Sequence, residues 1–336
     1  MIARPESQLL LQMDKKRHHY IPKAYLKSFC DSSGKVLVYR KDNPYKAIPL
    51  SPDNTGFHKY YYSQPRPEGG KDHNVLEDCF SSIETKWPRI VDQLYRRENL
   101  NDSLVDIFGF MALQRARVPA SRDAIEKMKA EEVKAKVRRL DAAGKLPPKP
   151  VGFEDLLDHV EVTIDPHQSI HAMVHVIRVT GHVLDRIGFF AIYNNIDVPF
   201  LTSDNPVIWF DPSVQDADLR PYVLQPNGPV VLLFPVSPSL IIYGDSSGRD
   251  RFASEGLGVA DLSDTGSVEM INRQVCRFGY QAIFAQKAGQ ERIIEEHAGL
   301  SPIIIIRFNR IGAGEDEAVF FEMVFGKRER KPRWVE

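Results

Sequence analysis

The order in which two hydrophobic patterns follow each other constrains the fold of this chain most. Apolar residues recur at helical spacing through much of residues 70–187, and short β-like runs replace them from residue 189 onward. A doubly wound parallel sheet would instead alternate the two patterns along the chain. The sequence therefore predicts an α+β fold, in which a helix-rich N-terminal half is followed by a mostly antiparallel sheet.

The same patterns predict how the chain is divided. We expect a flexible arm at residues 1–17 and a single α+β domain over residues 18–336. Within that domain the helix-rich part covers 70–187 and the strand-rich part covers 189–325. Pro119 should kink or break a helix, because proline lacks the N–H group that the helix needs.

Three local predictions can be checked directly. The aromatic run Tyr60 to Tyr62 is predicted to be a short strand, and the apolar residues from Leu76 to Leu94 predict one helix. A further helix is predicted over residues 166–187, with histidines on its polar face. These histidines are His167, His171, His175 and His182.

Histidines spaced by one helical turn could bind zinc. The glutamate of an HExxH motif is missing here, because Ala172 follows His171. A solvated polar face is the interpretation that we favour for this stripe.

Composition places the protein in a broad class. The chain of 336 residues has 44 lysines and arginines against 45 acidic residues, and it has no apolar run long enough to span a membrane. The apolar run Leu9 to Leu11 is too short for a signal peptide, so we do not expect secretion. Its cysteines are far apart, which does not favour a disulfide framework. We therefore expect a cytoplasmic protein without membrane attachment. The cysteines are Cys30, Cys79 and Cys276.

Basic residues gather near both ends of the sequence. Residues 1–49 contain ten lysines and arginines against four acidic residues, and a second basic cluster runs from Lys327 to Arg333. Two such patches could bind a polyanion, so nucleic acid is one candidate partner. Solvated surface charge is the simpler alternative.

Several short motifs follow one another along the chain. They are HHYIPKAYLKSF at 18–29, Glu77 to Glu84, Gln114 to Arg122, Phe200 to Val207, Pro235 to Pro238 and a late helix with Asn272. In this order they resemble the proteins grouped as domain of unknown function 4238. The resemblance extends through most of the chain, and the histidine stripe is not part of it. It implies little about chemistry, because that family is defined by sequence and not by a reaction.

Candidate catalytic residues come from two of these motifs. His18 or His19, fixed near the turn at Pro22, could act as a general acid or base near neutral pH. Asp204 follows a predicted strand end and is our candidate for their acidic partner. The alternatives are a structural histidine and an Asx-turn that caps its own backbone.

The remaining candidates are binding residues. Gln114, Arg117 and Arg122, with Asn205, are predicted to hold an anionic group, since a guanidinium fork suits a carboxylate or a phosphate. The same fork also suits an internal acidic side chain. Two further residues, Glu77 and Glu84, lie one heptad apart and could bind a divalent metal or pair with the arginines.

Our leading hypothesis is a hydrolase that acts on a phosphate-containing or otherwise anionic substrate, nucleic acid included. The competing hypothesis is a non-catalytic binding or scaffolding module in which the polar motifs form a buried network. The sequence lacks GxGxxG, GxxxxGK[ST] and GxSxG, so it offers no support for dinucleotide, P-loop or nucleophile-elbow chemistry. Substrate, cofactor and oligomeric state do not follow from the sequence.

Overall fold

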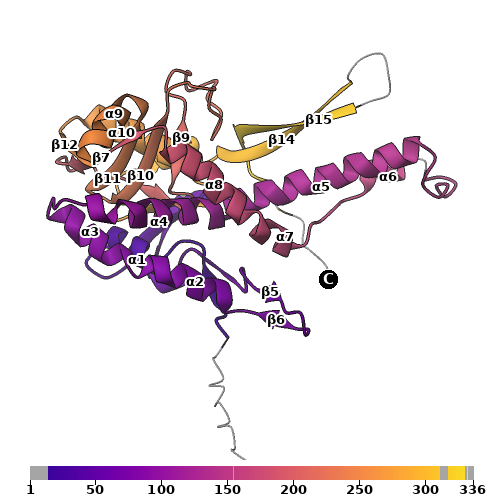
Figure 1. Ribbon diagram of the computed structural model, residues 1–336, viewed down its shortest axis with the longest axis horizontal. Helices are drawn as coiled ribbons and strands as arrows, with labels where there is room; N and C mark the ends of the chain where they lie inside the picture. Colours follow the sequence, from indigo (N-terminus) through magenta and orange to yellow (C-terminus); the bar gives the residue numbers. More distant parts are fainter. Residues whose placement is uncertain (1–13, 154, 311–316, 330, 332–336) are drawn as a thin grey trace, which may run out of the picture.

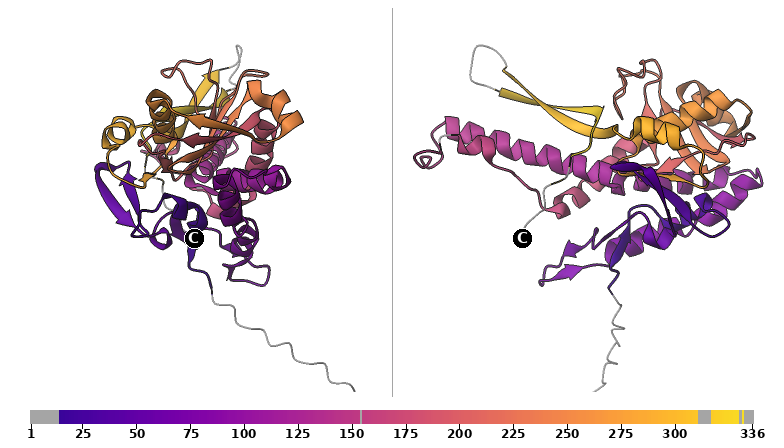
Figure 2. Two further views of the ribbon diagram at one scale, coloured as in Figure 1. Left: turned by 90° about the vertical axis from the view of Figure 1, so that its left-hand side faces the viewer. Right: turned by 180° about the vertical axis from the view of Figure 1, so that it is seen from behind.

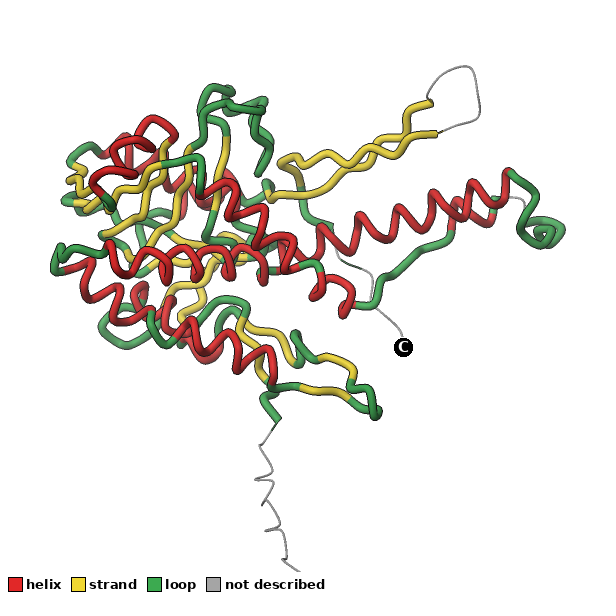
Figure 3. Tube along the Cα trace, viewed as in Figure 1, coloured by secondary structure: helices red, strands yellow, loops and turns green. Residues whose placement is uncertain are grey.

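A computed structural model describes residues 14–153, 155–310, 317–329 and 331. Its helices gather mostly in the first half of the chain and its strands mostly in the second, and the sheets are mostly antiparallel (Figures 1 and 3). The predicted α+β class is confirmed. No helix among these residues has both the length and the apolar character needed to cross a bilayer.

A five-stranded sheet forms the centre of the molecule, with strand order β12-β7-β11-β10-β9. The β12–β7 pair is parallel and the other pairs are antiparallel. Strands β10 and β7 are apolar on both faces and buried, because helices or a second sheet cover each side. The strands are β7 (Gly188–Asn194), β9 (Ile208–Phe210), β10 (Val231–Ser237), β11 (Leu240–Asp245) and β12 (Gly258–Leu262).

A second, four-stranded antiparallel sheet has the order β3-β2-β13-β8 and joins the N-terminal motif region to the late strands. The described residues also form three two-stranded sheets. The strands of the four-stranded sheet are β2 (Val36–Arg40), β3 (Asn43–Leu50), β8 (Thr202–Ser203) and β13 (Ala282–Ala285). The two-stranded sheets pair β1 (Arg17–His19) with β4 (Phe57–Lys59), β5 (Gln64–Pro65) with β6 (Lys71–Asp72), and β14 (Ser301–Arg310) with β15 (Glu317–Gly326).

Helices of the first half cover one face of the five-stranded sheet, and α10 packs against the other face. The first-half helices are α1 (Lys23–Leu26), α2 (Val75–Glu84), α3 (Trp87–Tyr95), α4 (Leu104–Arg117), α5 (Pro119–Ala142), α6 (Leu156–His159), α7 (Pro166–His171) and α8 (Met173–Leu184). The later helices are α9 (Arg249–Glu255), α10 (Thr265–Phe278) and α11 (Glu291–His297).

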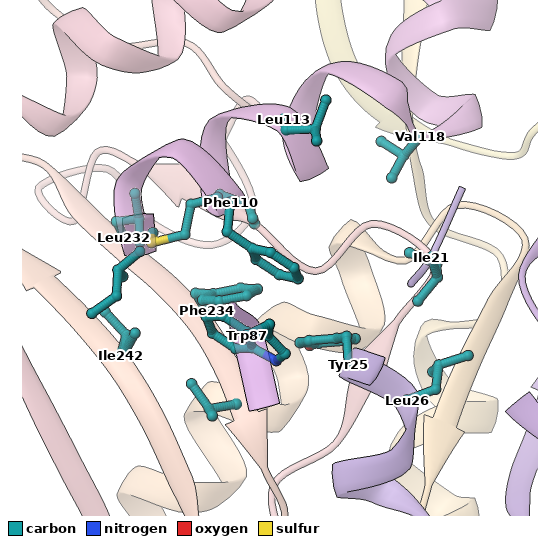
Figure 4. Close-up of a cluster of buried hydrophobic side chains, with 14 of the residues drawn as sticks. Ile21, Tyr25, Leu26, Trp87, Phe110, Leu113, Val118, Leu232, Phe234 and Ile242 are labelled. Atoms are coloured by element: carbon teal, nitrogen blue, oxygen red, sulfur yellow. The ribbon is translucent and has the colours of Figure 1, made fainter. Parts of the chain in front are cut away.

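The main hydrophobic core lies between α1, α3, α4 and β10 (Figure 4). The rings of Trp87 and Phe110 are stacked with centroids 4.1 Å apart, and Tyr25 stacks on Phe234 at 5.5 Å. The Tyr25 hydroxyl donates to the carbonyl of Pro235 at 2.6 Å, which satisfies its polar atom inside the core. The HHYIPKAYLKSF motif therefore anchors α1 to the central sheet.

Two helix predictions were wrong about continuity, and both helices are broken. The predicted helix from Leu76 to Leu94 consists of α2 and α3, and Pro88 stands in the first turn of α3, where a missing N–H costs nothing. The predicted helix over 166–187 is divided at Ala172 into α7 and α8. These two segments pack on different partners, α7 on α5 and α8 on α4.

The predicted strand over Tyr60 to Tyr62 was also wrong. The strand in this region is β4, which ends at Lys59, and Tyr60 has φ +56°, a left-handed conformation that leaves the extended region. As predicted, Pro119 ends a helix: Val118 is extended, with ψ 152°, and separates α4 from α5.

Two elements project from the body of the molecule in the same direction, the long helix α5 and the β14–β15 hairpin (Figures 1 and 2). Of the predicted arm, residues 1–13 lie outside the described part of the chain. Lys15, within that arm, contacts α2: its amide N donates to the Asn74 side chain at 2.9 Å and its ammonium pairs with Asp78 at 2.7 Å.

Candidate functional site

The side chain of His18 is completely buried, and main-chain groups occupy both of its ring nitrogens. The amide N–H of Tyr62 donates to Nδ1 at 2.8 Å, and Nε2 lies 2.7 Å from the carbonyl oxygen of Lys15. These contacts fit the neutral tautomer with the proton on Nε2. Burial lowers the pKa of His18, which also favours the neutral ring.

Asp204 is likewise buried, and its carboxylate accepts two main-chain hydrogen bonds, from Tyr280 N and Gln281 N, each at 2.8 Å. Burial raises the pKa of Asp204 to about 6, and the N–H donors oppose that rise. Neither His18 nor His19 is among its hydrogen-bond partners. The structure thus does not join the three predicted catalytic residues by direct contact.

Asn205 continues the same turn. Its side-chain N–H donates to the Tyr222 hydroxyl at 2.6 Å and to the carbonyl of Phe278 at 2.8 Å, while its side-chain oxygen is buried without a partner. Asp204 and Asn205 together fix the main chain that leads from α10 into β13. Within the described residues, these two motif side chains therefore point into the protein.

The predicted anion-binding residues Gln114 and Arg117 are also engaged inside the protein. The Gln114 amide donates to the carbonyl of Tyr20 at 2.8 Å and its oxygen accepts from Arg117 at 3.0 and 3.2 Å. Arg117 is 1% exposed and donates to Glu84 at 2.5 Å. Glu84 thus pairs with the guanidinium that the sequence analysis assigned to an anionic substrate.

Arg122, at the start of α5, is held by three oxygen atoms. It donates to Ser169 Oγ at 3.0 Å, to the carbonyl of Tyr61 at 2.7 Å and to the carbonyl of Pro166 at 2.8 Å, and it lies over the Tyr61 ring. Ser169 in turn donates to Glu126 at 2.6 Å. Arg122 therefore positions an acidic side chain of α5, Glu126, through Ser169.

That acidic side chain belongs to a cleft of about 270 Å³ between α5, residues 161–164 and the beginning of β14. Its walls combine apolar side chains with charges of both signs. The apolar residues are Ala120, Ala124, Ala130, Val162, Ile164, Pro302, Ile303 and Ile304, and the polar ones are Asp123, Glu126, Lys127, Glu131, Lys134, Glu161, Thr163, Tyr280, Lys327, Arg328, Glu329 and Lys331.

A lysine of the C-terminal basic cluster lies in this cleft between two carboxylates. The ammonium of Lys331 is 3.2 Å from Asp123 and also pairs with Glu126. The Tyr280 hydroxyl donates to the other oxygen of Asp123 at 3.0 Å. Asp204 accepts a hydrogen bond from the amide of Tyr280. Residues of the sequence motifs therefore position both carboxylates, Asp123 through Tyr280 and Glu126 through Ser169.

A second polar group lies where α2 meets α4 and β1. Burial, opposed by the charge of Arg117 and assisted by the neighbouring Glu84, raises the pKa of Glu77 to about 7. Nε2 of His19 is buried here without a hydrogen-bond partner, near enough to Glu84 to feel its charge. Glu84 is thus the common neighbour of three other predicted site residues, His19, Glu77 and Arg117.

Glu77 and Glu84 are the predicted metal ligands. Glu84 already accepts a hydrogen bond from Arg117. Across the described ranges, no group of three or more histidine, cysteine or acidic side chains is arranged to hold a metal ion. In the histidine stripe, His167 and His171 contact each other through Nε2 at 2.7 Å, and His175 and His182 are exposed.

The sequence analysis identified the basic cluster that supplies Lys331 but not the acidic residues of the cleft. Asp123 and Glu126 stand on a helix whose charges are distributed around its circumference, so no periodic pattern distinguishes them. Tyr280 lies far away in the sequence, between α10 and β13. Only their position in the sequence pointed to Asp123 and Glu126, because they follow Arg122, the last residue of the Gln114 to Arg122 motif.

These observations define an α+β protein in which a buried polar network supports a charged cleft. The chain belongs to the family described as protein of unknown function (DUF4238), whose sequence model matches residues 17–289. This confirms the resemblance seen in the motifs. No curated protein and no solved structure matches the chain.

Proposed function

We propose that this protein is a binding module whose cleft takes a ligand with a primary ammonium group, such as the lysine side chain of a peptide. One observation carries the proposal: Asp123 and Glu126 hold the ammonium of Lys331 at the cleft. An ammonium between two carboxylates forms charge-assisted hydrogen bonds, which are stronger than neutral ones. The motif residues then serve as framework, as in the non-catalytic hypothesis.

The fold holds the two carboxylates of this site in place. The side chains of Asp123 and Glu126 are 16% and 5% exposed, and the hydroxyls of Tyr280 and Ser169 hold them on a regular helix. Two buried carboxylates repel each other and need a cation. Lys331, which supplies this cation, is 37% exposed and follows the last described strand, β15.

The apolar wall of the cleft fits the rest of such a ligand. A lysine side chain buries its four methylene groups against apolar surface while its charged end finds a partner. Ile304 is 3% exposed and Ile303 lies beside it at the cleft. An aliphatic amine can therefore bury its stem and pair its head at the same place.

The test is calorimetric titration with Nα-acetyl-lysine amide. In a Lys331→Met variant the acidic pair has no internal cation, and we expect the probe to bind, whereas Nα-acetyl-norleucine amide does not. Adding Asp123→Asn and Glu126→Gln should abolish binding, and adding Glu131→Gln, another cleft residue, should leave it. Equal binding of the two amides, or no binding to Lys331→Met, would contradict the proposal.

A second candidate function, hydrolysis of a phosphate-containing substrate, has its own supporting observation. Glu77, with a pKa of about 7, and His19, whose Nε2 is buried without a partner, both lie near Glu84 and could act as acid and base near neutral pH. This assigns acid and base roles to His19 and Glu77, with Arg117 and Glu84 positioning them. The substrate would be a small phosphate ester or a nucleic acid.

Hydrolysis of bis(p-nitrophenyl) phosphate tests this candidate. His19→Gln and Glu77→Gln should each lower the rate by at least tenfold, while Asp204→Asn, outside this group, should not. A rate unaffected by the first two variants would exclude the site.

We also propose a cytoplasmic location, which the free thiols of Cys30, Cys79 and Cys276 support.

A further inference from the structure

Two histidines of the stripe, His167 and His171, stand one helical turn apart on α7 and bring two ring nitrogens together. Their Nε2 atoms are 2.7 Å apart, and their ring centroids are 4.2 Å apart with an angle of 77° between the ring planes. Two rings joined end to end by a hydrogen bond of this length would have centroids about 5 Å apart. The rings are therefore inclined to each other and meet at their Nε2 atoms.

The separation of these nitrogens suits two bonds to one metal ion. Imidazole nitrogens bind zinc at about 2.0–2.1 Å, so two of them lie about 2.9 Å apart at a right angle and about 3.3 Å apart at the tetrahedral angle. The observed 2.7 Å is closer to the first value, which belongs to the tetragonal complexes of copper(II) and nickel(II). Histidines at positions i and i+4 of one helix are also the pair that holds zinc in HExxH helices.

Contacts with neighbouring residues hold α7 in place before any ion binds. The carboxylate of Asp165 caps the helix by accepting a hydrogen bond from the amide of His167 at 2.9 Å. Arg122 of α5 donates to the carbonyl of Pro166 at 2.8 Å, and Ile170 is buried. Ligands on a fixed helix need little ordering when an ion binds, so the pair is preorganised.

Exposure and protonation leave the two Nε2 atoms as the nitrogens that an ion can reach. His171 is exposed, and His167 is half-buried with its Nδ1 inside the protein and without a hydrogen-bond partner in the described part of the chain. Burial lowers the pKa of His167, and the neighbouring His171 lowers it further. Metal binding requires the neutral ring, which this shift favours at neutral pH.

We propose that Nε2 of His167 and Nε2 of His171 bind one divalent transition-metal ion, of the kind that prefers tetragonal coordination, and that water completes its coordination. Imidazole suits nickel and copper, whereas magnesium and calcium prefer oxygen ligands. Two protein ligands leave further positions on the ion open. Neither histidine lines the cleft, so this site does not depend on the proposed function. His175 and His182 lie on α8, beyond the break at Ala172.

Calorimetric titration of the untagged protein with nickel chloride tests the site. We expect saturable binding of one Ni²⁺ per chain and no binding of Mg²⁺ over the same range. His167→Gln and His171→Gln should each weaken nickel binding by at least tenfold. The double variant His175→Gln, His182→Gln is the matched control, because it removes two exposed histidines of the same stripe, and it should bind nickel as the natural protein does.

A spectroscopic measurement on the natural protein keeps the test independent of folding in the variants. With one equivalent of Cu²⁺, electron paramagnetic resonance should show hyperfine coupling to two imidazole nitrogens. If His167→Gln does not fold, this spectrum and the exposed His171→Gln variant decide the question. Coupling to a single nitrogen, no saturable nickel binding in the natural protein, or an equal loss of binding in the control variant would overturn the proposal.

Discussion

Asp204→Asn is the substitution that best separates a structural carboxylate from a catalytic one. In the folded protein the pKa of Asp204 is raised from 3.8 to about 6, with burial as the main cause. A raised pKa means that the folded protein binds the proton more tightly than the unfolded chain. The stability that this group contributes is therefore present below pH 3.8 and is lost as the pH rises through 6.

The magnitude follows from the same two values. A carboxyl group whose pKa differs by about two between the folded and unfolded states changes the unfolding free energy by about 3 kcal/mol. Asparagine imitates the protonated side chain, so the two proteins should be almost equally stable near pH 4. At pH 7 the variant should be more stable, by up to about 3 kcal/mol.

The assay is urea unfolding of both proteins at intervals from pH 4 to pH 7. Asp264→Asn is a matched control, because Asp264 caps α10, is exposed and has a pKa lowered by hydrogen bonds from Ser267. The control should differ from the natural protein by an almost constant amount over this range, because a pKa lowered from 3.8 has its effect at lower pH. If Asp204→Asn behaves in the same way, burial does not disfavour the charged form of Asp204, as a catalytic partner would require, and our reasoning is refuted.

Three further substitutions test the framework, each by urea unfolding. Arg122→Met leaves the Tyr61 and Pro166 carbonyls without their donor and should cost about 3 kcal/mol or more, whereas the same change at exposed Arg96 should cost less than about 1 kcal/mol. Gly188→Ala should cost at least about 2 kcal/mol, because its Cβ would lie 2.1 Å from a main-chain oxygen, and Gly299→Ala, with open space around it, should be neutral to within about 0.5 kcal/mol. Glu77→Gln should gain stability relative to the natural protein as the pH rises from 4.5 to 7, since the pKa of Glu77 is raised to about 7; a pH-independent difference would contradict this.

Much of the fold could be predicted because local chemistry determines it. The change from helical to strand periodicity gave the α+β class, and Pro119 gave the break between α4 and α5 at Val118. The division of the predicted helix at Ala172 could not be predicted, because it depends on which helices α7 and α8 pack against. The left-handed Tyr60 likewise shows no signal in its aromatic side chain.

The candidate site was predictable only in part. The motif residues His18, Gln114 and Arg122 were recognisable, but their partners are mostly main-chain atoms distant in sequence, which no side-chain pattern reveals. The cleft depends on Tyr280 and Lys331 reaching Asp123 from separate segments. Contacts between segments distant in sequence depend on the topology of the fold. The sequence therefore identified the supporting framework and missed the charged group that Asp123, Glu126 and Lys331 form on it.

The most direct test of the proposed function is a crystal structure of the Lys331→Met protein grown with Nα-acetyl-lysine amide. The proposal predicts that the ammonium of the ligand lies between the carboxylates of Asp123 and Glu126, with its methylene groups against Ile303 and Ile304. A ligand bound elsewhere, or an acidic pair that closes on itself and excludes the amine, would contradict it.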